Sequence, residues 1–127
     1  MGIFFISFPR FFIQILYIKI YLLDIYMYNR YIVYMIKTFK CKETEQIYNQ
    51  QFSKKLPATI QKIALRKLIM MDNAENIQDL KVPPSNHLEK LSGDRAGQYG
   101  IRINDQYRIC FTVDNNDIHN VEIVDYH

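Results

Sequence analysis

The sequence predicts an α+β domain over residues 35–127, in which two helices pack on one face of a small antiparallel sheet. Two observations support this fold class. Apolar residues recur at helical spacing in the first half of this region, and the period changes to two after a pair of prolines. Turn-forming residues separate the later segments. A region of roughly ninety residues can bury one hydrophobic core and little more.

The first two elements are expected to be a strand and a helix. The sequence IKTFKC at residues 36–41 alternates apolar and polar side chains, which predicts a short N-terminal strand. Residues 42–51 predict a helix, because Glu43 and Glu45 place negative charge where its first turn would lie.

A second, amphipathic helix is expected over residues 57–73. Pro57 suits the first turn of a helix. The apolar residues at helical spacing are Ile60, Ile63, Ala64, Leu68 and Met71. Residues 74–80 add at most one more turn, since Pro83 and Pro84 exclude regular helix and favour an extended connection.

The remaining elements are expected to be short strands joined by tight turns. Their ranges are 87–91, 98–103, 107–113 and 121–124. The turns contain SGDRAG at 92–97, Asn104–Asp105, and Asn115–Asp117. Because each strand follows the previous one through such a turn, the segments predict an antiparallel meander.

Residues 1–34 differ in composition from the rest of the chain, with 11 of its 18 aromatic residues. Arg10, Lys19 and Asp24 make a transmembrane helix a poor interpretation, and the segment lacks the pattern of a secretory signal. Its residue types are those of A/T-rich codons. We therefore interpret it as translated upstream DNA and expect the natural start at Met35; a membrane-associated helix and a true extra domain are the alternatives.

The charge of the chain excludes a strongly basic nucleic-acid-binding domain. The net charge is +3, and Arg10, Lys19 and Arg30 against Asp24 put +2 of it in residues 1–34. The remaining +1 gives no field suited to non-specific duplex binding. If a nucleic acid is the partner, a local cationic site must bind it.

The two cysteines, Cys41 and Cys110, are too few for a disulfide framework and have no paired spacing for zinc. We expect both to be buried apolar groups in strands of a protein from the reducing cytoplasm. The sequence has no HExxH motif and no Gly-rich phosphate loop. Neither a metal nor a cofactor is expected.

Four basic residues are candidates for a phosphate-binding cluster. In the strand at 107–113, alternation places Arg108 opposite the aromatic and aliphatic side chains, and Arg102 is placed in the same way on its own strand. With Lys90 and Arg95 they would converge on one concave side and hold phosphates. The alternative is that all four are ordinary solvated side chains.

The chain ends in Asp125, Tyr126 and His127. These side chains offer acid–base groups near neutral pH and a ring that can stack on an unpaired base, although a frayed terminus is the simpler interpretation. His119 is expected to be solvated, and His87, beside the double proline, to be structural.

These motifs resemble a known family. The sequences PPSNHLEKLSGDRAGQYGIRINDQYRICF and VEIVDYH are similar to the HigB-like, plasmid-maintenance killer branch of the RelE/ParE superfamily of bacterial toxins. The resemblance covers residues 35–127. It implies an α+β toxin that cleaves mRNA, typically in the A site of a translating ribosome, and acts in the cytoplasm. It also implies a HigA-like helix-turn-helix antitoxin as neutralising partner and a toxin–antitoxin complex on operator DNA.

The resemblance also implies roles for the candidate residues. Arg108 and Arg95 correspond to phosphate and transition-state stabilisers. The C-terminal catalytic group would be Asp125, Tyr126 and His127, with His127 the acid–base group and Tyr126 the stacking group. Lys90 and Arg102 are candidates for binding the substrate in the same cleft.

The sequence departs from the family pattern at Glu89, because some members have a histidine two residues before the leucine that is Leu91 here. A weak or slow toxin is one expectation that follows. The alternative function is a non-catalytic or ParE-like toxin that acts by binding proteins, either inhibiting a topoisomerase or serving as a co-repressor.

Overall fold

The computed structural model describes the backbone of residues 10–31 and 35–126 and the side chains of residues 14–24 and 35–126. The chain forms two compact units, Met1–Val33 and Tyr34–His127. The first contains the helix α2 (Arg10–Tyr31), whose described apolar side chains are largely exposed. No described helix is both long and apolar enough to cross a membrane. The origin of residues 1–34 in upstream DNA stays a prediction.

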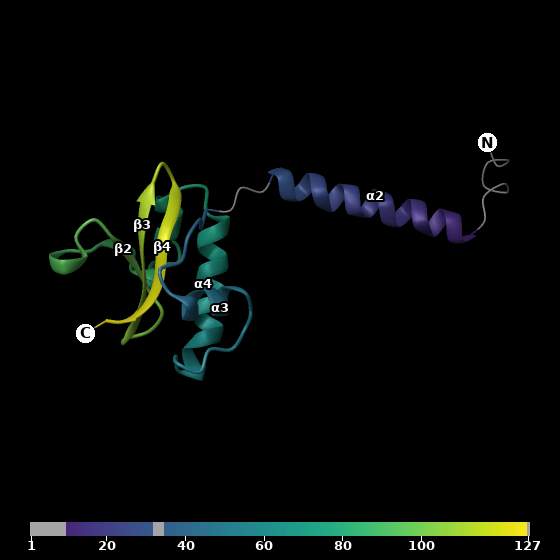
Figure 1. Ribbon diagram of the computed structural model, residues 1–127. Coiled ribbons are helices and arrows are strands. Elements are labelled where there is room, and N and C mark those ends of the chain that lie inside the picture. The colour runs from purple at the N-terminus through teal and green to yellow at the C-terminus, as the bar shows by residue number, and fades with distance from the viewer. Residues whose placement is uncertain (1–9, 32–34, 127) are drawn as a thin grey trace. The chain divides into compact units, whose positions relative to one another are not determined.

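The second unit has the predicted α+β class. Its helices are α3 (Lys42–Tyr48) and α4 (Ala58–Asn73), and its strands are β1 (Glu89–Lys90), β2 (Tyr99–Arg102), β3 (Tyr107–Asp114) and β4 (Asp117–Asp125). Short 3-10 turns occupy Ile77–Lys81, Pro84–Asn86 and Gly93–Arg95. The strands form one antiparallel sheet in the order β1-β2-β3-β4. Both helices lie on the same side of this sheet (Figure 1).

The helix α4 forms because its apolar residues make one continuous stripe, as predicted. Ile60, Ala64, Leu68 and Met71 are each at most 2% exposed. They belong to one core cluster with Phe111 of β3. Burying the larger side chains among them, Ile60, Leu68 and Met71, contributes about 1.5–3 kcal/mol each, so this stripe explains why α4 packs on the sheet.

The alternation predicted for β3 is confirmed. Ile109 pairs with Ile101 of β2 and with Ile123 of β4, and all three side chains belong to the core. Side chains alternate between the two faces of a strand. The intervening residues, among them Arg108, therefore lie on the side of the sheet that faces away from α4.

The predicted N-terminal strand at 36–41 is wrong in its extent. The segment makes two isolated parallel bridges to β4, Ile36 with Ile118 and Phe39 with Val121. A bulge in β4 at Asn120, where φ is 56°, separates the bridges, and the Asn120 N–H donates to Thr38 Oγ1 at 2.8 Å. The left-handed conformation of Asn120 interrupts the extended backbone of β4 between the two bridges, so no regular ladder forms there.

Several predicted boundaries also move. The helix expected over 42–51 ends at Tyr48, and the last strand begins at Asp117 instead of residue 121. The strand expected over 87–91 shrinks to Glu89–Lys90, because His87 adopts a left-handed conformation with φ 46° after a 3-10 turn. Such a residue cannot belong to a regular strand.

The two cysteines differ from each other. Cys110 is buried in β3, as predicted. Cys41 is only half-buried and precedes the first residue of α3, so its assignment to a strand is wrong. Its sulfur lies 2.9 Å from Thr44 Oγ1 within the first turn.

Candidate active site

The face of the sheet that points away from α4 carries two cross-strand rows. One row contains Glu89, Gly100, Cys110 and Glu122, and the next contains Arg102, Arg108 and Val124. Residues that pair across strands share a face, as do residues two apart on one strand. We call this side of the sheet the open face.

A glycine lets the segment after β1 fold against the open face. A Cβ at Gly100 would lie 3.3 Å from the Cδ2 atom of Leu91, which is itself buried. The next residues turn sharply at Gly93, whose φ is 62° and therefore favours glycine. This path brings Arg95 onto the open face beside β4.

Arg108 occupies the centre of the open face and is mostly buried. Its guanidinium carbon lies 4.9 Å from the centroid of the Tyr126 ring, a cation–π distance. Its Nη1 atom lies 3.5 Å from Glu89 Oε1, and this buried nitrogen has no hydrogen-bond partner among the described residues. Because a buried donor normally has a partner, this nitrogen is poised to bind an oxygen of a ligand.

Arg95 is held by a carboxylate on β4. Its Nη1 atom lies 3.0 Å from Glu122 Oε1 and 3.1 Å from Gln98 Oε1. The hydrogen bond to Glu122 raises the pKa of the Arg95 guanidinium above its usual range. Lys40 Nζ lies 3.5 Å from the same Glu122 oxygen. Glu122 therefore gathers two cations at one edge of the open face.

Cys110 lies between the two arginines. Burial raises the pKa of its thiol, and the positive charge of Arg95 acts in the opposite direction, as does the smaller effect of Arg108. The thiol is fully buried and stays neutral at neutral pH. Cys110 is thus a packing residue beneath the cations and no nucleophile.

The predicted convergence of the four basic residues is wrong for Lys90. Lys90 Nζ lies 5.9 Å from the centroid of the Tyr99 ring, and Tyr99 stacks on Phe111 on the side that faces α4. Neighbours along a strand point to opposite faces. The residue of β1 that reaches the open face is therefore Glu89.

Asp125 and Tyr126 are consecutive residues and, like Glu89 and Lys90, lie on opposite sides of the sheet. Asp125 pairs with Tyr107 across the sheet, and its Oδ2 atom accepts a hydrogen bond from Gln106 Nε2 at 3.0 Å. The predicted grouping of Asp125 with Tyr126 is therefore not seen, because their side chains lie on opposite sides of the sheet. His127 lies outside the described residues.

Arg102 shares the open face with Arg108 but lies at the edge of the sheet. The two arginines are direct cross-strand partners. The Arg102 guanidinium donates to Asp105 in the turn between β2 and β3. Arg102 is thus the link between the centre of the open face and its border.

Sequence reasoning missed Glu122 and Lys40. Alternation around Val121 and Ile123 would have placed Glu122 on the open face, so a signal for it was present. For Lys40 none existed, because its position depends on the irregular parallel bridges to β4.

The open face combines the guanidinium groups of Arg95, Arg102 and Arg108 with carboxylates and a phenol ring. Guanidinium groups bind phosphate oxygens in a bidentate manner, and the Tyr126 ring is half-buried beside Arg108. Within the part of the chain that the structure describes, no three His, Cys, Asp or Glu side chains cluster to hold a metal ion. The arrangement suits binding of a phosphate diester.

The fold and this face define a small α+β protein that presents paired arginines on the side of its sheet opposite the helices. Residues 37–127 match the family described as the RelE-like toxin of the type II toxin-antitoxin system HigB. The chain therefore belongs to the family of HigB-like toxins.

Two relatives are similar to the chain in sequence. Toxin HigB-1 of Vibrio cholerae is 40% identical over 78 residues, which is 61% of this chain and 82% of that protein. An uncharacterized protein of Haemophilus influenzae is 43% identical over 67 residues, which is 53% of this chain and 66% of that protein. The chain thus matches just under two thirds of the length of the Haemophilus relative.

The fold was also compared with solved structures. A heterotetrameric YoeB-YefM toxin-antitoxin complex from Staphylococcus aureus matches with a TM-score of 0.44 and 22% identity over 72% of this chain and 94% of the matched chain. A second YoeB-YefM complex from the same organism gives 0.40 and 19% over 72% and 97%.

Proposed function

We propose that this HigB-like toxin is a ribosome-dependent endoribonuclease that cleaves mRNA and thereby inhibits translation. The observation that carries the proposal is the buried Nη1 atom of Arg108, which has no hydrogen-bond partner among the described residues and belongs to a guanidinium group that packs against the Tyr126 ring. A scissile phosphate oxygen would satisfy this donor while an adjacent base stacks on Tyr126.

In the proposed reaction, the ribose 2′-oxygen attacks the adjacent phosphorus and the bond from phosphorus to the 5′-oxygen breaks. The products are a 2′,3′-cyclic phosphate and a 5′-hydroxyl end. Arg108 and Arg95 stabilise the negative charge that develops on the phosphoryl oxygens. The 2′-hydroxyl must lose a proton and the leaving 5′-oxygen must gain one.

His127 is our candidate for these proton transfers, because an imidazole titrates near neutral pH. Asp125 pairs with Tyr107, on the side of the sheet opposite Arg108, and is a weaker candidate than His127. Glu89 is the carboxylate that the structure places 3.5 Å from Arg108 Nη1, at the position where some family members have a histidine. We assign Glu89 as the second candidate for a proton-transfer group.

Carboxylates on the open face also suggest why the ribosome would be needed. Glu89 and Glu122 each lie within 3.5 Å of an arginine, so free RNA must compete with these ion pairs for the guanidinium groups. A message held in the ribosome is presented at high effective concentration. The low net charge of the domain supports this dependence on the ribosome. We propose the cytoplasm as the compartment in which the toxin acts, since translating ribosomes are found there.

We also propose that a HigA-like helix-turn-helix antitoxin neutralises the toxin and that the two proteins bind operator DNA as a complex. Membership of the HigB-like family supports this partner. No membrane partner is proposed.

The test is growth arrest after induction of the full chain and of its Arg108→Ala and His127→Ala variants. We expect each variant to lose most of the toxicity while keeping the circular dichroism spectrum of the parent. Lys54→Ala, which removes an exposed lysine away from the open face, is the matched control and should stay toxic. If both site variants arrest growth as strongly as the parent does, the nuclease assignment is wrong and a protein-binding toxin is favoured.

A further inference from the structure

A second basic cavity lies at the edge of the sheet, between α4 and β2. Its volume is about 530 Å³. It is lined by Arg66 and Lys67 of α4, by Ser85 and His87 at the 3-10 turn before β1, and by Arg102 of β2. None of the described side chains that line this cavity carries a carboxylate. We call it the edge cavity.

The positive charge of the edge cavity is poorly compensated. The Lys67 ammonium donates to the neutral amide oxygen of Asn86. Burial lowers the pKa of Lys67, and the neighbouring Arg66 lowers it further. Arg102 is paired with Asp105, whose side chain is 95% exposed, and such an exposed pair contributes little. A bound anion would therefore be stabilised by Arg66 and Lys67, with Arg102 at the border of the cavity.

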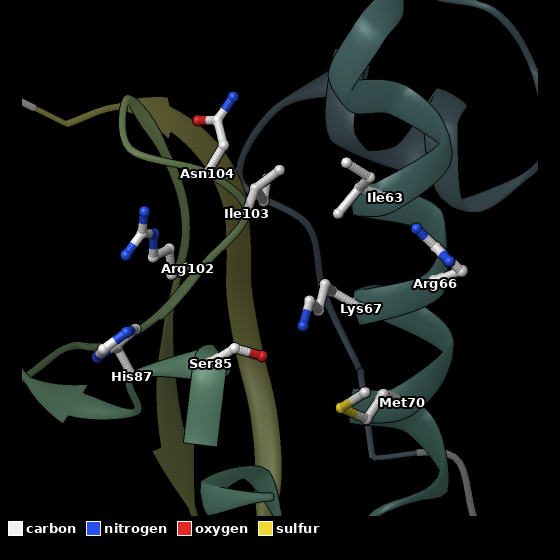
Figure 2. Close-up of a pocket in the computed structure, with 9 residues that line it drawn as sticks. All are labelled: Ile63, Arg66, Lys67, Met70, Ser85, His87, Arg102, Ile103 and Asn104. Atoms are coloured by element: carbon white, nitrogen blue, oxygen red, sulfur yellow. The ribbon is translucent and has the colours of Figure 1, made fainter. Parts of the chain in front are cut away.

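The edge cavity is continuous with the open face. Arg102 is the cross-strand partner of Arg108. β1 pairs with β2 only at Tyr99 and Gly100, so among the described strands none flanks β2 at Arg102 on that side. Figure 2 shows Arg102 extending from β2 away from α4, while Lys67 and Ser85 point into the space between α4 and β2. A chain of cations thus runs from Arg108 around the sheet edge to α4.

We propose that the edge cavity binds a second phosphate group of the same RNA strand whose scissile phosphate lies at Arg108. This inference rests on the proposed function and extends it to residues that lie outside the cleavage site. Guanidinium, ammonium and hydroxyl donors are the groups that bind phosphate oxygens. A free nucleotide offers the same phosphate chemistry, whereas an acidic peptide would have no need of the continuity through Arg102.

The test measures binding of a ten-nucleotide RNA carrying 2′-O-methyl groups, which cannot be cleaved, to the full chain as a function of salt. Each phosphate contact in a single strand contributes about 0.7 to the slope of log affinity against log salt. We expect Arg66→Ala and Lys67→Ala each to weaken binding roughly threefold to tenfold at low salt and to lower this slope by about 0.7. Arg66 is exposed, so its variant leaves the fold intact.

Lys62→Ala is the matched control, because Lys62 is an exposed lysine of the same helix that does not line the edge cavity. It should bind the RNA as the parent does. Binding of 5′-AMP or inorganic phosphate alone, with loss in Arg66→Ala, would assign the cavity to a free phosphate ligand and overturn the RNA proposal. If only an acidic peptide such as oligoglutamate binds in the edge cavity, the RNA proposal is overturned as well.

The two proposals fail in different ways. If Arg108→Ala weakens binding of the RNA while Arg66→Ala and Lys67→Ala leave it unchanged, the edge cavity is no phosphate site and the proposed nuclease stands. If the parent binds no RNA even at low salt, the inference is overturned as well. The cleavage assay on ribosomes decides the proposed function independently of this measurement.

Discussion

The two sides of the sheet are built from the same strands and carry opposite chemistry. The side against α4 contributes aliphatic and aromatic residues such as Ile109 and Phe111, which are fully buried. The open face carries Arg108 from the same strand, with a buried nitrogen that has no hydrogen-bond partner among the described residues. One side is therefore expected to determine stability and the other to determine activity.

A domain this short holds a polar site on the same strands that form its core. A strand supplies core and site residues in alternation, so the site requires no additional element. Glu122 is an example. It follows Val121, which belongs to the core, and its side chain forms an ion pair with Arg95 on the open face. Substitutions on the two sides should separate into two classes of effect.

The largest effect is expected from Phe111→Ala on the side against α4. Removing this fully buried ring leaves a cavity in the core, which typically lowers the free energy of unfolding by about 3–5 kcal/mol. Chemical denaturation of the parent and the variant measures the change. Loss of less than 1 kcal/mol would show that this side does not form the core.

Arg108→Ala should have a large effect on activity and a small one on stability. Loss of one group that stabilises transition-state charge typically costs about 10²–10³ in rate. The rate of mRNA cleavage on ribosomes should fall by that factor while the denaturation midpoint stays close to that of the parent. Arg108→Lys should restore little of the cleavage rate, since an ammonium group lacks the planar guanidinium geometry that binds phosphate and stacks on Tyr126.

Glu122→Gln should have a moderate effect. Glu122 orients Arg95 by a charge-assisted hydrogen bond, and loss of such a bond is expected to lower the cleavage rate about tenfold, the equivalent of roughly 1.4 kcal/mol. Comparison with Arg95→Ala and with the double variant in the same assay tests the coupling. Independent, multiplicative effects of the two substitutions would contradict the positioning role.

The two thiols should differ in reactivity. Burial raises the pKa of Cys110, so at pH 7–8 it stays protonated and is shielded, whereas Cys41 is only half-buried. A thiol reagent should modify Cys41 first, and Cys41→Ser should leave a chain that is modified slowly until it is unfolded. Rapid labelling of Cys110 in the folded chain would contradict the full burial of its side chain.

The smallest effect is expected from Lys90→Ala. Lys90 lies over Tyr99 on the side opposite Arg108, so its removal should change the cleavage rate by less than about twofold, the change expected of an exposed charge. A loss comparable to that of Arg108→Ala would show that Lys90 reaches the substrate after all.

Much of this arrangement is predictable from the sequence, because alternation and helical periodicity act over short distances. Alternation places the side chain of Arg108 on the other side of the sheet from that of Ile109, and helical periodicity predicts α4 from its stripe of apolar residues. They fail for the segment at 36–41, where pairing depends on a bulge at Asn120 in a distant strand. A local pattern contains no information on such a partner.

The candidate site was predictable where it depends on alternation within one strand and not where it depends on contacts between distant segments. Alternation correctly separates Arg102 and Arg108 from the core, whereas Lys90 was assigned to the wrong face because the register of the two-residue strand β1 is set by its pairing with Tyr99 and Gly100. The role of Glu122 follows from the fold of the segment that carries Arg95, which requires Gly100 beneath Leu91. These features are consequences of tertiary contacts.

The most direct test of the central claim is a map of mRNA 5′ ends after induction of the full chain and of Arg108→Ala. The proposed chemistry predicts new 5′-hydroxyl ends within translated messages when the parent is induced, and their loss in the variant. Growth arrest without new ends, or the same ends with Arg108→Ala, would contradict the assignment of the open face as the site of RNA cleavage.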